Sequence, residues 1–110
     1  ATLHCNDMPI TIGDDCMFSW GINLMASDYH QIIDNETSGI RNMPTIGIII
    51  GNHVWVGMDA LILKDTKISD NSVVAARSVV SGTFDEPNVI IAGTPARVIK
   101  SGTNWKRDFV

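Results

Sequence analysis

The side chains best suited to proton transfer near neutral pH are those of the three histidines, His4, His30 and His53. A neutral imidazole accepts a proton and the imidazolium returns it, because the group titrates near pH 6.5. His30 stands at the start of a polar stretch with turn-forming residues, and sites are often built on loops of a rigid scaffold. His53 is interpreted as an exposed structural residue, and nothing singles out His4. His30 is therefore the candidate base, with a merely solvated loop histidine as the alternative.

Zinc binding is the other chemistry that three histidines could support. A zinc site needs three or more ligands that converge with suitable spacing. The histidines here are widely spaced, and no His-x-x-x-x-His pair occurs. We therefore expect no metal cofactor.

A six-residue period organises the middle of the chain. Aliphatic residues stand six apart without a gap at Ile50, Val56, Ile62, Ile68, Val74 and Val80, and mostly small residues follow them. This period fits neither an amphipathic helix nor a simple alternating strand. It fits a chain that turns a corner every six residues, so that three short strands close a triangular coil of about eighteen residues. The coils would stack about 4.8 Å apart through parallel-strand hydrogen bonds.

The same period appears earlier and is then interrupted. Ile12, Phe18 and Leu24 give one further coil, but counting on in sixes from Leu24 never reaches Ile50. The residues from about Tyr29 to Pro44 are polar and rich in turn formers. We predict a loop insertion there.

The end of the chain departs from the period as well. Residues 83–88 read as a turn, residues 89–92 as a last strand-like side and residues 96–100 as a final short strand. The segment from Trp105 to Arg107 could be a short helix or an extended tail. Residues 3–9 give no clear assignment.

Composition narrows the possible partners. A net charge of −4 and a pI near 5.1 argue against nucleic acid. Charged residues make up only 18% of the chain, which suggests surface buried in an oligomer. The apolar runs are too short to span a bilayer, and Cys5 and Cys16 do not form a disulfide framework. Cys16 takes a small position of the repeat and is expected to be a reduced core thiol, so we expect a cytoplasmic protein.

Three stretches resemble one family. Val54-Trp55-Val56-Gly57, Ser78-Val79-Val80 and the run from Ala92 to Ile99 (AGTPARVI) are similar to motifs of the hexapeptide-repeat acyltransferases. The resemblance runs from about Ile10 to about Arg107. It implies an all-β, left-handed parallel β-helix of about three to five coils with almost no helix. The chain is treated as one domain, residues 1–110; it begins at Ala1 inside a coil, so it is either a fragment or has an unusually short N-terminal cap.

The resemblance assigns a catalytic pair. The stretch from Ser27 to Asp34 is similar to that of sugar and capsular-polysaccharide O-acetyltransferases, where the catalytic histidine leaves the coil, and this implies His30 as general base. Met58 matches the residue whose backbone N–H faces the thioester carbonyl, where an amide would stabilise an oxyanion.

The resemblance also assigns binding residues. On the acetyl-CoA side it implies Trp55, Gly57, Ala76, Arg77 and Ser81, with coil packing as the alternative for Trp55. Arg77 departs from the family pattern and would either crowd the groove or pair with a CoA phosphate. Asp34 and Asn42 match polar residues of the insertion and would face the acceptor, with solvated loop polarity as the alternative. Trp105 and Arg107 resemble a C-terminal Trp-x-Arg or merely cover the end of the β-helix.

The predicted function is therefore a CoA-dependent O-acetyltransferase that acts on a hydroxyl of a sugar or polysaccharide precursor. The alternatives are a drug-modifying acetyltransferase of the same fold and a non-catalytic β-helix used for structure or binding. The resemblance further implies a homotrimer, in which neighbouring chains enclose the donor groove and the insertion reaches across to a partner.

Overall fold

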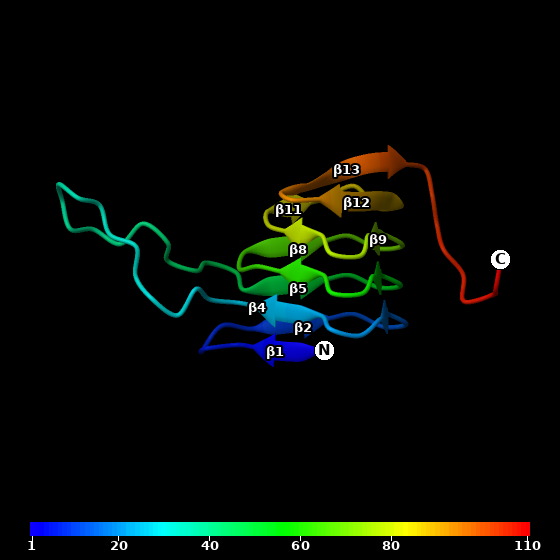
Figure 1. Cartoon of the computed structure of the whole chain (residues 1–110), viewed down its shortest axis with the longest axis horizontal. Coiled ribbons are helices and arrows are strands. Elements are labelled where there is room, and N and C mark those ends of the chain that lie inside the picture. The colour runs from blue at the N-terminus through cyan, green and yellow to red at the C-terminus, as the bar shows by residue number, and fades with distance from the viewer.

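The protein is described by a computed structural model that covers all 110 residues, and it contains thirteen strands and no helix (Figure 1). The strands are β1 (Thr2–His4), β2 (Ile10–Ile12), β3 (Met17–Phe18), β4 (Asn23–Met25), β5 (Ile48–Ile50), β6 (Trp55–Val56), β7 (Leu61–Ile62), β8 (Thr66–Ile68), β9 (Val73–Val74), β10 (Val79–Val80), β11 (Thr83–Phe84), β12 (Val89–Gly93) and β13 (Ala96–Ser101). The fold therefore has no helix that is long and apolar enough to cross a membrane.

The strands form three sheets that make the sides of a triangular coil. Their orders are β1-β4-β7-β10, β11-β8-β5-β2 and β13-β12-β9-β6-β3, and every pairing is parallel except β12 with β13. Trp55 pairs with Val73 and Leu61 with Val79, so paired residues are eighteen positions apart in the uninterrupted coils between β5 and β10. The predicted triangular coil is confirmed.

The residues of the six-residue period form the core. Ile50, Val56, Ile62, Ile68, Val74 and Val80 are each exposed by 1% or less. Burying one such side chain contributes roughly 1.5–3 kcal/mol relative to leaving it in water. The period thus stabilises the stack coil by coil, and the end coil is looser, since Phe18 is only partly buried and Ile12 is 38% exposed.

Three corners connect the sides, and we name them by the strands they join. The first corner joins β2–β3, β5–β6, β8–β9 and β11–β12; the second joins β3–β4, β6–β7 and β9–β10; the third joins β1–β2, β4–β5, β7–β8 and β10–β11. Each corner needs left-handed backbone. At the first corner the residues with positive φ are Asp15, His53, Asn71 and Asn88. Asp, Asn and His all adopt this conformation more readily than most residues, so all four residues suit the corner.

The predicted insertion fills the third corner between β4 and β5. Residues 26–47 contain no strand, only an antiparallel bridge between Ile33 and Ile40, and they project away from the stack (Figure 1). The Asp65 carboxylate accepts the N–H groups of Thr45 and Ile46, each at 2.8 Å. Burial alone would raise the pKa of Asp65, but these N–H groups hold it below its usual value. Asp65 thereby anchors the return of the insertion to the β-helix.

The structure defines both ends of the chain, which the sequence analysis did not assign. The N-terminal residues form β1, which pairs with β4. The final strand β13 folds back antiparallel on β12, and residues 102–110 form an extended tail without helix. Cys16 is a free, partly buried thiol whose Sγ lies 3.3 Å from the carbonyl oxygen of Gly51, and Cys5 is free and exposed. The predicted reduced thiol at Cys16 is consistent with this position.

Candidate active site

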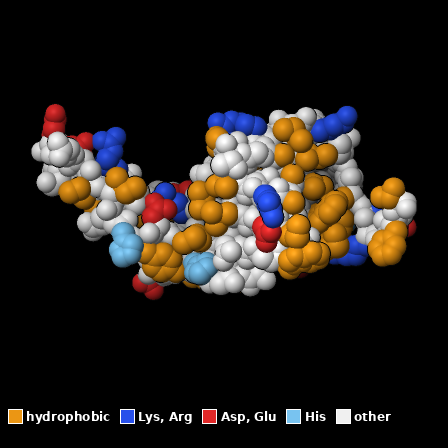
Figure 2. Space-filling view, in the orientation of Figure 1, with side chains coloured by type: hydrophobic (Ala, Val, Ile, Leu, Met, Phe, Trp, Pro, Cys, Tyr) orange, Lys and Arg blue, Asp and Glu red, His pale blue; other side chains and the backbone are white.

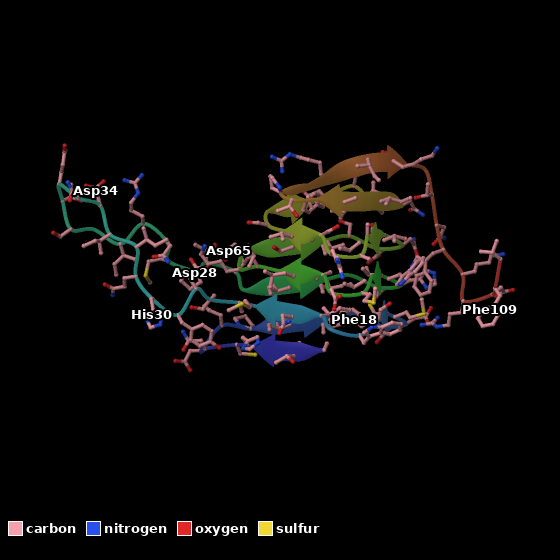
Figure 3. The ribbon with its side chains drawn as sticks, in the orientation of Figure 1. Phe18, Asp28, His30, Asp34, Asp65 and Phe109 are labelled. Carbon is pink, nitrogen blue, oxygen red and sulfur yellow. The ribbon has the colours of Figure 1, made fainter.

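His30 lines a surface hollow at the base of the insertion. The hollow also involves Asn6, Met8, Ser27, Asp28, Tyr29, Gln31, Ile40, Asn42, Met43 and Pro44. Tyr29 has a φ of 66°, which turns the chain sharply just before His30. The His30 N–H donates to the carbonyl of Asp28 at 2.8 Å, while its imidazole makes no hydrogen bond within the chain. The ring is therefore exposed and free to accept a proton from an external group (Figure 3).

Asn42 holds the backbone around His30. Its Nδ2 donates to the carbonyl oxygen of His30 at 2.9 Å and to Asp28 Oδ2 at 2.8 Å, and its Oδ1 accepts the N–H of Ile32 at 2.8 Å. The structure therefore places Asn42 beside His30. With these contacts made, Asn42 orients the loop that carries His30 and has little hydrogen-bonding capacity left for a ligand.

Asp28 is a residue of this site that sequence reasoning did not assign. Its carboxylate accepts from Asn42 and lies 3.1 Å from Lys64 Nζ. The hydrogen bond from Asn42 and the Lys64 ammonium hold the pKa of Asp28 below its usual value, against the effect of burial. Lys64 follows β7, far along the chain, so no local pattern indicates this contact. Asp28 joins the start of the insertion to the β-helix.

Asp34 lies away from the His30 hollow, at the far end of the insertion (Figure 3). Its carboxylate accepts the N–H groups of Glu36 and Thr37 and pairs with Arg41 at 2.6 Å. The Thr37 and Glu36 N–H groups, with Arg41, keep the pKa of Asp34 below its usual range. Asp34 therefore closes the loop tip, and within one chain the structure does not bring it to His30.

The second corner carries a ladder of backbone groups. Trp20, Met58 and Ala76 occupy equivalent positions in three successive coils, as the strand registers require. The Trp20 carbonyl accepts from Asp59 N and the Met58 carbonyl accepts from Arg77 N, at 3.0 and 2.8 Å. By contrast, the N–H groups of Met58 and Ala76 donate no hydrogen bond within the chain. Two unused amides, one coil apart, can therefore receive an extended ligand that carries carbonyl groups.

Gly57 and Arg77 flank this ladder in different ways. Gly57 is buried, and a Cβ there would lie 2.6 Å from Ala76 N and 2.9 Å from the Val74 carbonyl oxygen. Close stacking of coils thus explains the glycine without any ligand. The Arg77 side chain is 79% exposed and only loosely paired with Asp59, at 3.8 Å. Its guanidinium therefore remains available to an anionic group.

Trp55 and Ser81 lie to either side of the second corner. Trp55 is in β6, before the corner, and Ser81 follows β10, at the third corner, where it is exposed. The predicted donor residues therefore extend from β6, past the second corner, to the end of β10 rather than meeting at one point. The indole Nε1 of Trp55 is buried and has no hydrogen-bond partner, which is costly for a polar group.

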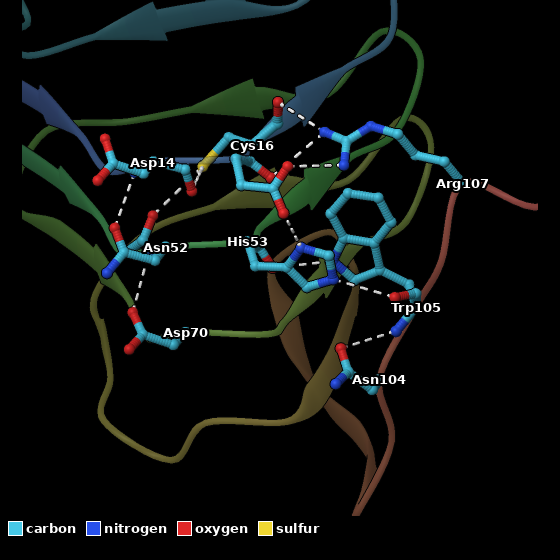
Figure 4. Close-up of polar contacts among 10 residues, drawn as sticks. Asp14, Cys16, Asn52, His53, Asp70, Asn104, Trp105 and Arg107 are labelled. Atoms are coloured by element: carbon cyan, nitrogen blue, oxygen red, sulfur yellow. Dashed lines mark hydrogen bonds and ion pairs between the residues drawn. The ribbon is translucent and has the colours of Figure 1, made fainter.

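The expectation that His53 is exposed is wrong. This residue is partly buried rather than exposed, because the C-terminal tail packs on it (Figure 4). Its ring stacks on Trp105 with centroids 4.0 Å apart and planes 7° apart. Nδ1 lies 2.7 Å from Asp15 Oδ2, and Nε2 lies 3.0 Å from the carbonyl oxygen of Trp105. Sequence reasoning missed this contact because His53 lies far from Asp15 and Trp105 along the chain.

Trp105 and Arg107 both belong to the cluster around His53. Trp105 is buried and donates its indole N–H to the His53 carbonyl at 2.8 Å. Arg107 pairs with Asp15 at 2.7 Å and lies over the Trp105 ring, 5.0 Å from its centroid. The tail therefore covers the first corner and β6, not the end of the β-helix.

One chain does not assemble the predicted catalytic pair. His30 belongs to the insertion at the third corner, whereas Met58 belongs to the second corner. No group of three His, Cys, Asp or Glu side chains is placed to hold a metal ion. What the geometry provides is an exposed imidazole at one corner and a pair of free amides at another.

Comparisons with known proteins agree with the fold. The family model for the bacterial transferase hexapeptide (six repeats) matches residues 47–82. A galactoside O-acetyltransferase of Escherichia coli (strain K12) is 35% identical over 95 residues, which cover 86% of this chain and 45% of that protein.

Two solved structures are similar over most of the chain. A polysialic acid O-acetyltransferase has a TM-score of 0.86 at 40% identity and covers 92% of this chain and 47% of its own. A galactoside acetyltransferase in complex with coenzyme A has a TM-score of 0.68 at 33% identity, over 87% of this chain and 46% of its own. The chain thus spans about half the length of the proteins it matches. With its repeat, its parallel sheets and these relatives, the chain belongs to the hexapeptide-repeat acetyltransferases, and its fold is their left-handed parallel β-helix.

Proposed function

We propose that the protein is a CoA-dependent O-acetyltransferase whose acceptor is a hydroxyl of a sugar or polysaccharide precursor. The observation that carries the proposal is the pair of unused amides of Met58 and Ala76, one coil apart at the second corner. The similar proteins act, by their names, on galactosides and polysialic acid, and one of them holds coenzyme A. Acetyl-CoA is therefore the proposed donor.

Each of the proposed donor-binding residues has a separate role along the groove. The Ala76 amide binds a carbonyl of the pantetheine arm, and its small side chain leaves room for that arm. Trp55 flanks the arm, Ser81 offers a hydroxyl, and the exposed guanidinium of Arg77 takes a CoA phosphate. Gly57 serves the groove indirectly, since its lack of a Cβ lets the two coils approach.

The reaction follows from one base and one oxyanion donor. Neutral His30 accepts the proton of the acceptor hydroxyl while its oxygen attacks the thioester carbonyl carbon. The Met58 amide donates a hydrogen bond to the tetrahedral oxyanion. Collapse breaks the carbon–sulfur bond, and the thiolate takes the proton from the His30 imidazolium. The acetyl ester and free CoA leave, and no covalent enzyme intermediate is needed.

A shared site explains why one chain separates the two groups. In a homotrimer with its axis parallel to the stack, the insertion of one chain reaches the second corner of its neighbour. His30 and Asn42 then approach the neighbour's Met58. The insertion exposes Ile32, Ile33, Ile40 and Met43 by 42–60%, and Figure 2 shows apolar side chains on it and on the flank of the stack. Such surface is typical of an interface.

An acceptor screen tests the function directly. The protein is incubated with acetyl-CoA and a panel of sugars, oligosaccharides and antibiotics, and thiol release is followed. Release that depends on a sugar supports the proposal; release with an antibiotic alone would favour the drug-modifying alternative. Absence of release with every acceptor, although CoA binds, would favour a binding module. The free thiols at Cys5 and Cys16 accord with a cytoplasmic location, where acetyl-CoA is available.

A further inference from the structure

His53 is placed to hold the C-terminal tail through both of its ring nitrogens. Nδ1 faces a carboxylate oxygen of Asp15 at 2.7 Å, and Nε2 faces the carbonyl oxygen of Trp105 at 3.0 Å. Both partners can only accept hydrogen bonds, so each ring nitrogen must donate one. Only the imidazolium carries two N–H groups. The docked tail therefore requires a protonated His53.

The surroundings favour that protonated form. The charged groups that face the ring are Asp15 and Arg107. Arg107 is directed to Asp15 Oδ1, which leaves Oδ2 for His53. The ring also lies flat on Trp105, whose π-face attracts a cation. The Trp105 carbonyl and Asp15 raise the pKa of His53 above its ordinary value of 6.5.

The contacts of the His53 ring with Asp15 and Trp105, here called the clamp, lie beside the proposed donor groove. Trp105 lies against Trp55, with ring centroids 6.2 Å apart and planes at 51°. Trp55 is the residue proposed to flank the pantetheine arm. The docked tail thus holds Trp105 beside the Trp55 ring.

We propose that His53 is a proton-dependent positioning residue: as an imidazolium it fixes the tail from Asn104 to Arg107 over β6, and the docked tail sets Trp55 for binding the acyl donor. Only the link from the docked tail to binding of the acyl donor rests on the proposed function. Because protonation in the docked state is favoured, docking is fully present below the ordinary pKa of histidine. It is lost as the pH rises through the higher pKa of the docked state.

Ring ¹⁵N NMR of His53 tests the clamp without any activity. In the wild type, both nitrogens are expected to carry protons at pH 6.5, and the backbone amides of Lys106 and Arg107 should gain mobility over the pH range in which His53 loses its proton. Asp15→Asn should shift the His53 midpoint downward, and asparagine tolerates the positive φ of Asp15. Asp14→Asn is the matched control, since its carboxylate makes no contact with the His53 ring. An unmoved midpoint in Asp15→Asn, or tail mobility that ignores the titration, would overturn the clamp.

Kinetics separate the clamp from the proposed function. In the wild type, KM for acetyl-CoA should rise with pH through the His53 midpoint, and Asp15→Asn should move that rise to lower pH while changing kcat by less than about twofold. A KM that does not follow the midpoint would overturn the link to Trp55. If no acceptor is acetylated, the proposed function fails, and the NMR titration still decides the clamp.

Discussion

His30 and Met58 lie at different corners of the same β-helix, His30 in the insertion at the third corner and Met58 in the ladder at the second. A base must come within hydrogen-bond reach of the proton it takes, and the oxyanion donor must face the same reacting carbon. The two groups can share one reaction only if they come from different chains.

Removal of the base is the first prediction. His30→Asn should lower transfer by roughly 10²–10⁴ while CoA still binds, because the donor ladder at the second corner is untouched. Thiol release and calorimetry with CoA measure the two effects. His4→Gln is the matched control; His53 is unsuitable, since it holds the tail. Turnover of His30→Asn close to that of the wild type would remove His30 from the mechanism.

A charge placed on the donor ladder should block the ligand. Ala76 is exposed at the second corner, so Ala76→Glu should weaken CoA binding at least tenfold and change the melting temperature little. Thr83→Glu introduces the same charge at an exposed position of β11 and should leave the affinity unchanged. Equal CoA affinity in both variants would show that the groove lies elsewhere.

Coil stacking makes Gly57 sensitive to a single methyl group. In Gly57→Ala the Cβ would lie 2.6 Å from Ala76 N, so the coils must separate. We expect a loss of roughly 1–3 kcal/mol in the free energy of unfolding, measured by denaturant titration. The comparison is Gly39→Ala in the insertion, where the nearest atom is the Thr37 hydroxyl oxygen at 3.2 Å. A Gly57→Ala protein as stable as the wild type would contradict this account of the corner.

Asp65 should keep the C-terminal end of the insertion, at Thr45 and Ile46, fixed to the β-helix. In Asp65→Ala the N–H groups of Thr45 and Ile46 lose their acceptor, and their hydrogen exchange should accelerate roughly tenfold or more. The pKa of Asp65 lies below its usual value of 3.8, so in the wild type this anchoring is present above pH 3.8 and is lost as the pH falls through the lowered pKa. Unchanged exchange at both amides in the variant would show that other contacts hold this end.

Much of the fold follows from the period of six. The spacing from Ile50 to Val80 determines the side length, the buried face and the eighteen-residue register, and its break after Leu24 locates the insertion. The antiparallel return of β13 and the docking of Trp105 were not predicted, because they depend on contacts without a repeat. Asp34 shows the same limit for the site: its sequence position suggested an acceptor ligand, but local N–H groups occupy its carboxylate.

Complementation between two inactive chains tests the shared site most directly. His30→Ala and Ala76→Glu chains with different tags are co-expressed, and particles that carry both tags are purified and assayed. Each site would take its base from one chain and its groove from the next. Every trimer that carries both tags then has one intact site of three, so these particles should recover up to about a third of wild-type activity. Each variant alone should stay inactive. No recovery in particles shown to contain both chains would contradict a site built between chains.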